Sequence, residues 1–72
     1  MWRVVKIEKA FLYAKPEETA KTKMYLIRSD AVRLLQTDGT HQWYFVEFKG
    51  KKTVNGWVKT SDLGSIPGSE GL

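Results

Sequence analysis

The sequence predicts an all-β domain, a small barrel of five to six short antiparallel strands. Apolar and polar residues alternate with a period of two in several short runs. Turn-forming residues such as the Asp-Gly pair at 38–39 separate these runs. No apolar period of 3.6 residues extends beyond about two helical turns. Short strands that are regularly interrupted by turns are typical of small barrels.

The first half of the chain contains two strand-like runs and one long loop. Residues 5–8 alternate apolar and polar side chains, and residues 10–13 follow as a second apolar run. Residues 15–23 are polar, lack periodicity and include a proline, so we expect a long first loop there. Loops of this length in compact domains are often functional.

The second half repeats strand and turn more regularly. Strands are predicted at 24–27, 31–35, 43–48 and 53–58, separated by tight turns. A helix over residues 29–35 is the alternative for the second of these, but its flanking turns favour a strand. A short helical turn at 60–63, with a hydroxyl cap, precedes the last strand.

The length of 72 residues limits the chain to one domain with a small core. We assign residues 1–66 to the barrel, with a last short strand at 65–66, and residues 67–72 to a flexible tail or linker. Shared strand parity predicts a core of nine apolar side chains. These are Val5, Ile7, Met24, Leu26, Val32, Leu34, Val46, Val58 and Leu63.

Composition narrows the possible chemistry. The absence of cysteine excludes disulfides and cysteine metal sites. Twelve Lys and Arg against eight Asp and Glu give a net charge of +4, which permits an acidic partner without requiring one. No targeting segment and no apolar run of membrane-spanning length is visible, so a signal peptide of an exported parent protein would lie outside this chain.

The sequence predicts no catalytic residue, no metal site and no cofactor, so we expect a protein that is not an enzyme. Its single histidine, His41, lies in a turn near Asp38, with no serine in a nucleophile elbow. Glu17 and Glu18 are adjacent on a loop and would point apart. No constellation therefore satisfies the requirements of an active site.

Four aromatic residues are the candidate binding site. If Val46 and Val58 face the core, strand parity turns Trp43, Phe45 and Trp57 outward. Tyr13, from the long loop, would complete an exposed aromatic face, with Glu17 and Glu18 nearby. Such a cluster is typical of a binding surface. The alternative is that these rings only cover a very small core or contact the rest of a larger protein.

Four motifs in order resemble the bacterial SH3-like (Src-homology-3-type) family across residues 4–66. They are Ala-Phe-Leu-Tyr-Ala-Lys-Pro at 10–16, Leu-Ile-Arg-Ser-Asp-Ala-Val-Arg-Leu-Leu at 26–35, Trp-Tyr-Phe-Val at 43–46 and Gly-Trp-Val-Lys-Thr-Ser-Asp-Leu at 56–63. Ser29 replaces the family's turn glycine. If the backbone there has a positive φ, serine destabilises the turn by about 1 kcal/mol relative to glycine.

The resemblance implies a groove for a peptide ligand, with Tyr13 and Trp43 at two of its five aromatic or proline positions. Lys15, Lys59 and Asp62 occupy the other three, which disfavours ordinary binding of proline-rich peptides. It also implies a non-catalytic binding or targeting module for peptides or peptidoglycan, in the cell envelope or periplasm if a signal peptide lies outside this chain.

Two other functions stay open: a protein–protein adaptor or regulatory domain, and a nucleic-acid-binding small barrel. The nucleic-acid alternative depends on the basic residues, above all the lysine-rich turn at 49–52. We expect a monomer, because no residue argues specifically for an edge-paired dimer.

Overall fold

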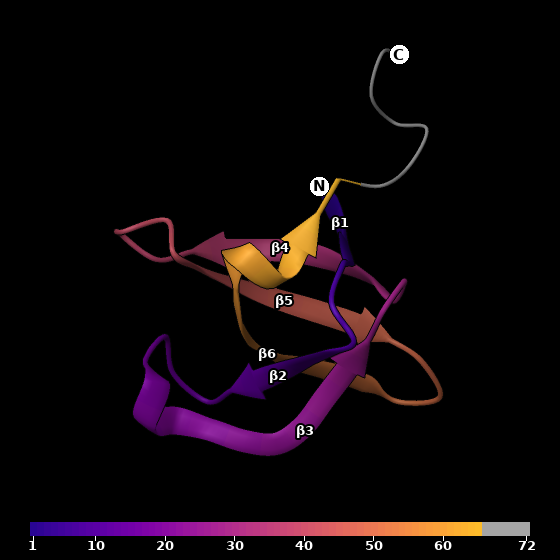
Figure 1. The fold of residues 1–72 in the computed structure, drawn as a ribbon, viewed down its shortest axis with the longest axis horizontal. Helices are drawn as coiled ribbons and strands as arrows, with labels where there is room; N and C mark the ends of the chain where they lie inside the picture. The colour runs from indigo at the N-terminus through magenta and orange to yellow at the C-terminus, as the bar shows by residue number, and fades with distance from the viewer. Residues whose placement is uncertain (66–72) are drawn as a thin grey trace.

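The structure, a computed structural model, describes residues 1–65 and contains one sheet of seven antiparallel strands (Figure 1). The order across the sheet is β3-β2-β6-β5-β4-β1-β7. Two short 3₁₀ helices, η1 (Glu18–Ala20) and η2 (Thr60–Asp62), complete the fold. The strands are β1 (Trp2–Val5), β2 (Lys9–Tyr13), β3 (Lys21–Ile27), β4 (Ala31–Thr37), β5 (Trp43–Lys49), β6 (Thr53–Lys59) and β7 (Leu63–Gly64).

The predicted all-β class is confirmed, and the sheet curls into a half-barrel whose two edges are β3 and β7. Seven strands are present, more than the five to six predicted. β1 lies between β4 and the two-residue β7, which forms at Leu63–Gly64 and not at the predicted 65–66. Ile66 and the predicted tail at 67–72 lie outside the described residues. Within residues 1–65, no helix has the length and apolar character needed to cross a membrane.

The first strand lies earlier than predicted. β1 ends at Val5, where the predicted strand at 5–8 began. Val5 exchanges backbone hydrogen bonds with the β3–β4 turn: its N–H donates to Asp30 O, and its carbonyl accepts from Ser29 N–H. Lys6 N–H instead donates to Asp62 O at 3.0 Å. Val5 and Ile7 still pack at the core while Lys6 and Glu8 are exposed, so the alternation continues past the end of the strand.

The first loop is shorter than predicted, because β3 begins at Lys21 within the predicted 15–23 segment. Ala14 N–H donates to Ala20 O at 2.9 Å and closes the loop around η1. The Thr22 hydroxyl donates to Leu12 O at 2.7 Å and extends the hairpin. The predicted helical turn before the last strand is present as η2, but the predicted hydroxyl cap is wrong: Lys59 is the N-cap residue, and no side chain makes a capping hydrogen bond there.

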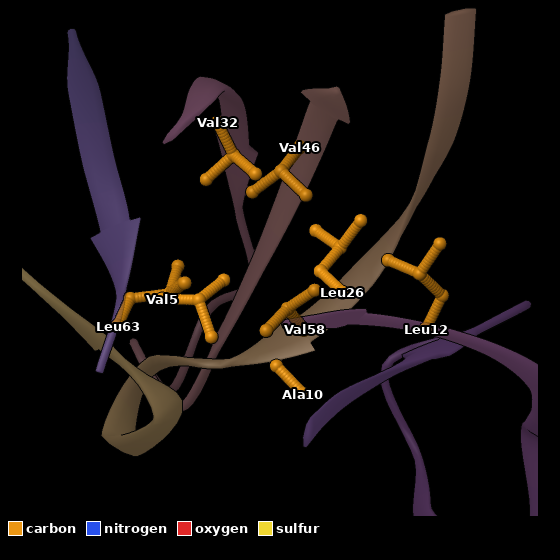
Figure 2. Close-up of a cluster of buried hydrophobic side chains, with 8 residues drawn as sticks. All are labelled: Val5, Ala10, Leu12, Leu26, Val32, Val46, Val58 and Leu63. Carbon is orange, nitrogen blue, oxygen red and sulfur yellow. The ribbon is translucent and has the colours of Figure 1, made fainter. Parts of the chain in front are cut away.

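Eight side chains form the buried core on the inner face of the sheet (Figure 2). Six of the nine predicted core residues belong to it, and Ile7 and Leu34 pack against it while partly exposed. The prediction that Met24 belongs to the core is wrong. Met24 is 52% exposed, because β3 is an edge strand whose pairing with β2 is irregular there. The eight are Val5, Ala10, Leu12, Leu26, Val32, Val46, Val58 and Leu63.

The β2–β3 hairpin joins the rest of the sheet at one point. Only Tyr13 and Trp57 pair between β2 and β6. Beside this pair, the buried Gly56 lets Leu12 approach: a Cβ at Gly56 would lie 3.2 Å from Leu12 Cβ and 3.3 Å from Cδ2. These separations are tighter than most real Cβ contacts. The absence of a side chain at Gly56 therefore lets the hairpin sit directly on β6.

The turn between β3 and β4 contains a residue in the left-handed region. Asp30 N–H donates to Ile27 O at 3.0 Å, and Ser29, at the third position of this turn, has φ 78°. Type II turns require a positive φ at that position and favour glycine there. The positive φ considered in the sequence analysis is thus present, and we expect the Ser29 side chain to destabilise the turn relative to glycine.

Ser29→Gly is expected to stabilise the fold by about 1 kcal/mol, because glycine adopts positive φ without the steric penalty of a Cβ. The measurement is the midpoint of chemical denaturation. Ser61→Gly, at an exposed serine without a positive φ, is the matched control and should give no gain. A lower midpoint for Ser29→Gly would contradict the assigned turn.

Val46→Ala should destabilise the fold by about 1–3 kcal/mol, because it removes two methyl groups from a fully buried site. Met24→Ala, at an exposed site of a strand, is the comparison and should change stability by less than about 0.5 kcal/mol. Denaturation midpoints of the two variants measure this difference. Equal losses at the two positions would show that the core is misplaced.

Candidate ligand-binding site

The sheet brings the four predicted aromatic residues to one face. In the register of β5 and β6, Trp43 lies opposite Lys59, and Phe45 lies opposite Trp57. Tyr13 lies opposite Trp57 from the other side of β6. Directly paired residues of adjacent strands point to the same side of a sheet. The rings therefore share the outer face, as strand parity predicted.

The predicted exposure was wrong for two of these rings. Tyr13 is 5% exposed and Trp43 is 7% exposed, because their rings pack edge to face with centroids 4.7 Å apart. The Lys59 ammonium lies above the Tyr13 ring, 5.8 Å from its centroid. Phe45 and Trp57 form a second pair at 5.3 Å and remain partly exposed. The four predicted rings thus form one buried and one accessible aromatic pair.

Asp38 fixes the loop that leads into Trp43. Its Oδ1 accepts hydrogen bonds from the backbone N–H groups of Gln42 and Trp43, at 3.1 and 3.2 Å. Its Oδ2 accepts one from the Thr40 hydroxyl at 2.7 Å. These bonds, that of Thr40 foremost, lower the pKa of the Asp38 carboxyl. The Asp-Gly turn signal predicted this loop but not the bonds that position Trp43.

A shallow pocket of about 230 Å³ opens beside Trp43. Three separate segments line it: η1, the loop before β5, and the end of β6 with η2. The lining combines the indole with hydroxyl groups, an amide, a carboxylate and an ammonium group. This combination suits a polar ligand with an apolar part. The lining residues are Glu18, Gln42, Trp43, Lys59, Thr60 and Ser61.

An ion pair between the first loop and β6 lies at the wall of this pocket. Lys59 Nζ lies 2.6 Å from Glu18 Oε1, and the two side chains are 35% and 68% exposed. The hydrogen bond from Lys59 to Glu18 raises the pKa of the Lys59 ammonium. Glu17 is exposed and is absent from the pocket lining, so of the two predicted loop carboxylates only Glu18 belongs to the pocket.

Asp62, in η2, is the other charged residue at this end of the sheet. Partial burial raises the pKa of its carboxyl, although the positive charges of Lys59 and Lys6 oppose the shift. Compared with the unfolded chain, the fold therefore destabilises the carboxylate relative to the protonated carboxyl. Within residues 1–65, no group of three metal-binding side chains is close enough to hold an ion.

Asp62→Asn should raise the melting temperature at neutral pH, because asparagine is neutral and avoids the partial burial of a charged carboxylate. A pKa that is raised on folding contributes stability below its unfolded value and loses it as the pH rises. The advantage of Asp62→Asn should thus shrink as the pH falls through the raised pKa, and vanish below the ordinary value of 3.8.

Melting temperatures of wild type and variant across this pH range measure the effect. Glu8→Gln, which neutralises an exposed carboxylate, controls for the loss of one negative charge. An advantage of Asp62→Asn that stays constant with pH would contradict the role of burial.

Comparison of the chain with protein-family models, curated proteins and solved structures finds no match. The resemblance to the bacterial SH3-like family therefore stays a prediction from the motifs. The site has three features that a ligand could contact: a buried indole at the wall of a small pocket, an ion pair that also lines it, and an accessible aromatic pair on the same face of the sheet.

Proposed function

We propose that this protein is a non-catalytic recognition module of the SH3-like type that binds a peptide or a peptidoglycan fragment in the pocket beside Trp43. The observation that carries the proposal is that the Glu18–Lys59 ion pair and the indole of Trp43 line the same pocket. A rigid aromatic residue loses little side-chain entropy when a ligand binds.

The order of elements supports the SH3-like part of the proposal. A hairpin with a long connection precedes β4, a tight hairpin joins β5 and β6, and a 3₁₀ turn leads into a short last strand. The motifs that resemble the family fall on these elements: 10–16 on β2 and its loop, 43–46 on β5, and 56–63 on β6 and η2.

The charges at the pocket support a ligand with charged groups. A ligand ammonium would replace Lys59 as the partner of Glu18, and a ligand carboxylate would replace Glu18 as the partner of Lys59. A peptide carries both groups, whether it is free or attached to peptidoglycan. The cell-wall part of this ligand class comes from the family resemblance alone.

A protein partner is the second candidate, and the accessible pair of Phe45 and Trp57 favours it. An adaptor interface would extend from the pocket across this pair, whereas a small peptide would perturb the pocket alone. Aromatic residues of this kind are enriched among the residues that dominate binding energy at protein interfaces.

Titration of the isotope-labelled protein with peptidoglycan stem peptides, observed by NMR, tests the proposal. We expect shifts at Trp43, Lys59 and the residues of η2. Trp43→Phe should weaken binding by about 1–2 kcal/mol, since it shrinks the pocket wall but keeps an aromatic ring against Tyr13. Glu18→Gln should weaken the binding of peptides that carry an ammonium group.

Trp2→Phe is the matched control, because Trp2 is exposed on β1 and does not line the pocket. Its affinity should equal that of wild type. Shifts confined to residues outside the pocket, or equal losses for Trp2→Phe and Trp43→Phe, would refute the proposed site.

A further inference from the structure

The outer face of the β2–β3 hairpin has a composition of its own. β2 and β3 contain three lysines, three aromatic residues and no acidic residue. In their register, Lys9 lies opposite Ile27, and Phe11 lies opposite Tyr25. The intervening Ala10 and Leu26 face the core, so the lysines and rings of these pairs face away from it.

Lysines and rings alternate closely on this face. The Phe11 and Tyr25 rings are 5.4 Å apart between centroids. The Lys21 ammonium lies 4.1 Å from the centroid of Phe11, and the Lys9 ammonium lies 5.0 Å from that of Tyr25. We call these four residues, Lys9, Phe11, Lys21 and Tyr25, the hairpin cluster. None of them lines the pocket beside Trp43.

Within residues 1–65, the ammonium groups of Lys9 and Lys21 contact aromatic rings and form no ion pair. Among the ion pairs of residues 1–65, those within 4.0 Å involve Lys49 and Lys59, not Lys9 or Lys21. Attraction between an exposed ammonium and a ring is weak compared with a charge-assisted hydrogen bond to an anion. An anionic ligand would therefore draw both ammonium groups away from the rings and leave the ring faces free.

Protection of a sheet edge explains only part of this arrangement. Lysines on an edge strand discourage pairing with other chains, and Lys21 and Lys23 lie on the edge strand β3. Lys9 lies on β2, which is not an edge strand of the sheet, although β2 pairs with β6 only at Tyr13. Edge protection also gives no reason for Tyr25, an aromatic residue 44% exposed beside these charges.

We infer that the hairpin cluster binds single-stranded nucleic acid, with bases stacked on Phe11 and Tyr25 and phosphates bound by Lys9 and Lys21. Sequence-tolerant single-strand binding combines these two elements, a stacking surface and cations along the backbone. An acidic peptide would use the charges and leave the rings unused, and the bases of a duplex are not free to stack on them. This inference is independent of the peptide site.

Fluorescence anisotropy of labelled oligothymidylate with the full chain at low salt tests the inference. Lys9→Gln/Lys21→Gln should weaken binding about tenfold. It should also reduce the slope of log affinity against log salt by about 1.4, since each phosphate contact on a single strand contributes roughly 0.7. Lys51→Gln/Lys52→Gln, with the same change of charge in the exposed β5–β6 turn, should leave the slope unchanged.

Variants of Tyr25 distinguish the contribution of base stacking from that of charge. Tyr25→Ala should weaken binding about tenfold by removal of a stacking surface, whereas Tyr25→Phe should bind as wild type does. Melting temperatures confirm that each variant folds, and the exposed positions chosen make unfolding a poor explanation for a loss.

Three results would overturn the inference. The first is no binding of oligothymidylate by wild type at low salt. The second is equal affinity for a duplex or for polyglutamate, which would show that charge alone is recognised. The third is an equal loss in the two double-lysine variants, which would show that the hairpin cluster is not the site.

Discussion

The arrangement of this protein depends on how a projecting hairpin attaches to the rest of one curled sheet. The hairpin β2–β3 pairs with β6 only at Tyr13 and Trp57, so hydrogen bonds of the sheet alone hold it weakly. Two packing contacts supplement that pairing. Leu12 sits against the bare backbone of Gly56 on the inner face, and Tyr13 packs against Trp43 on the outer face.

Both contacts follow from the alternation of side chains along β2. Leu12 packs in the core on the inner face, and its neighbour Tyr13 packs against Trp43 on the outer face. Two successive residues of β2 therefore attach the hairpin to both faces of the sheet. The same alternation places lysines and rings of the hairpin cluster on the outer face. The pocket depends on this attachment as well, because Glu18 reaches Lys59 only while the hairpin and its loop lie over β6.

Local patterns in the sequence, above all the alternation of apolar and polar residues along strands, predicted most of the fold. The parity of Val46 and Val58 placed the core and turned Phe45 and Trp57 outward, because a period of two is fixed by strand geometry. The same parity failed at Met24, since it cannot tell whether a strand lies at the edge of the core. It also could not show that Tyr13 and Trp43 bury one another, because their contact joins residues far apart in the chain.

A double-mutant cycle between Tyr13 and Trp43 tests the attachment most directly. Free energies of unfolding of Tyr13→Leu, Trp43→Leu and the double variant give the coupling between the two rings. An edge-to-face pair that fastens the hairpin should give a coupling of about 0.5–1.5 kcal/mol. Losses that simply add would contradict this account, since the two rings would then stabilise the fold independently.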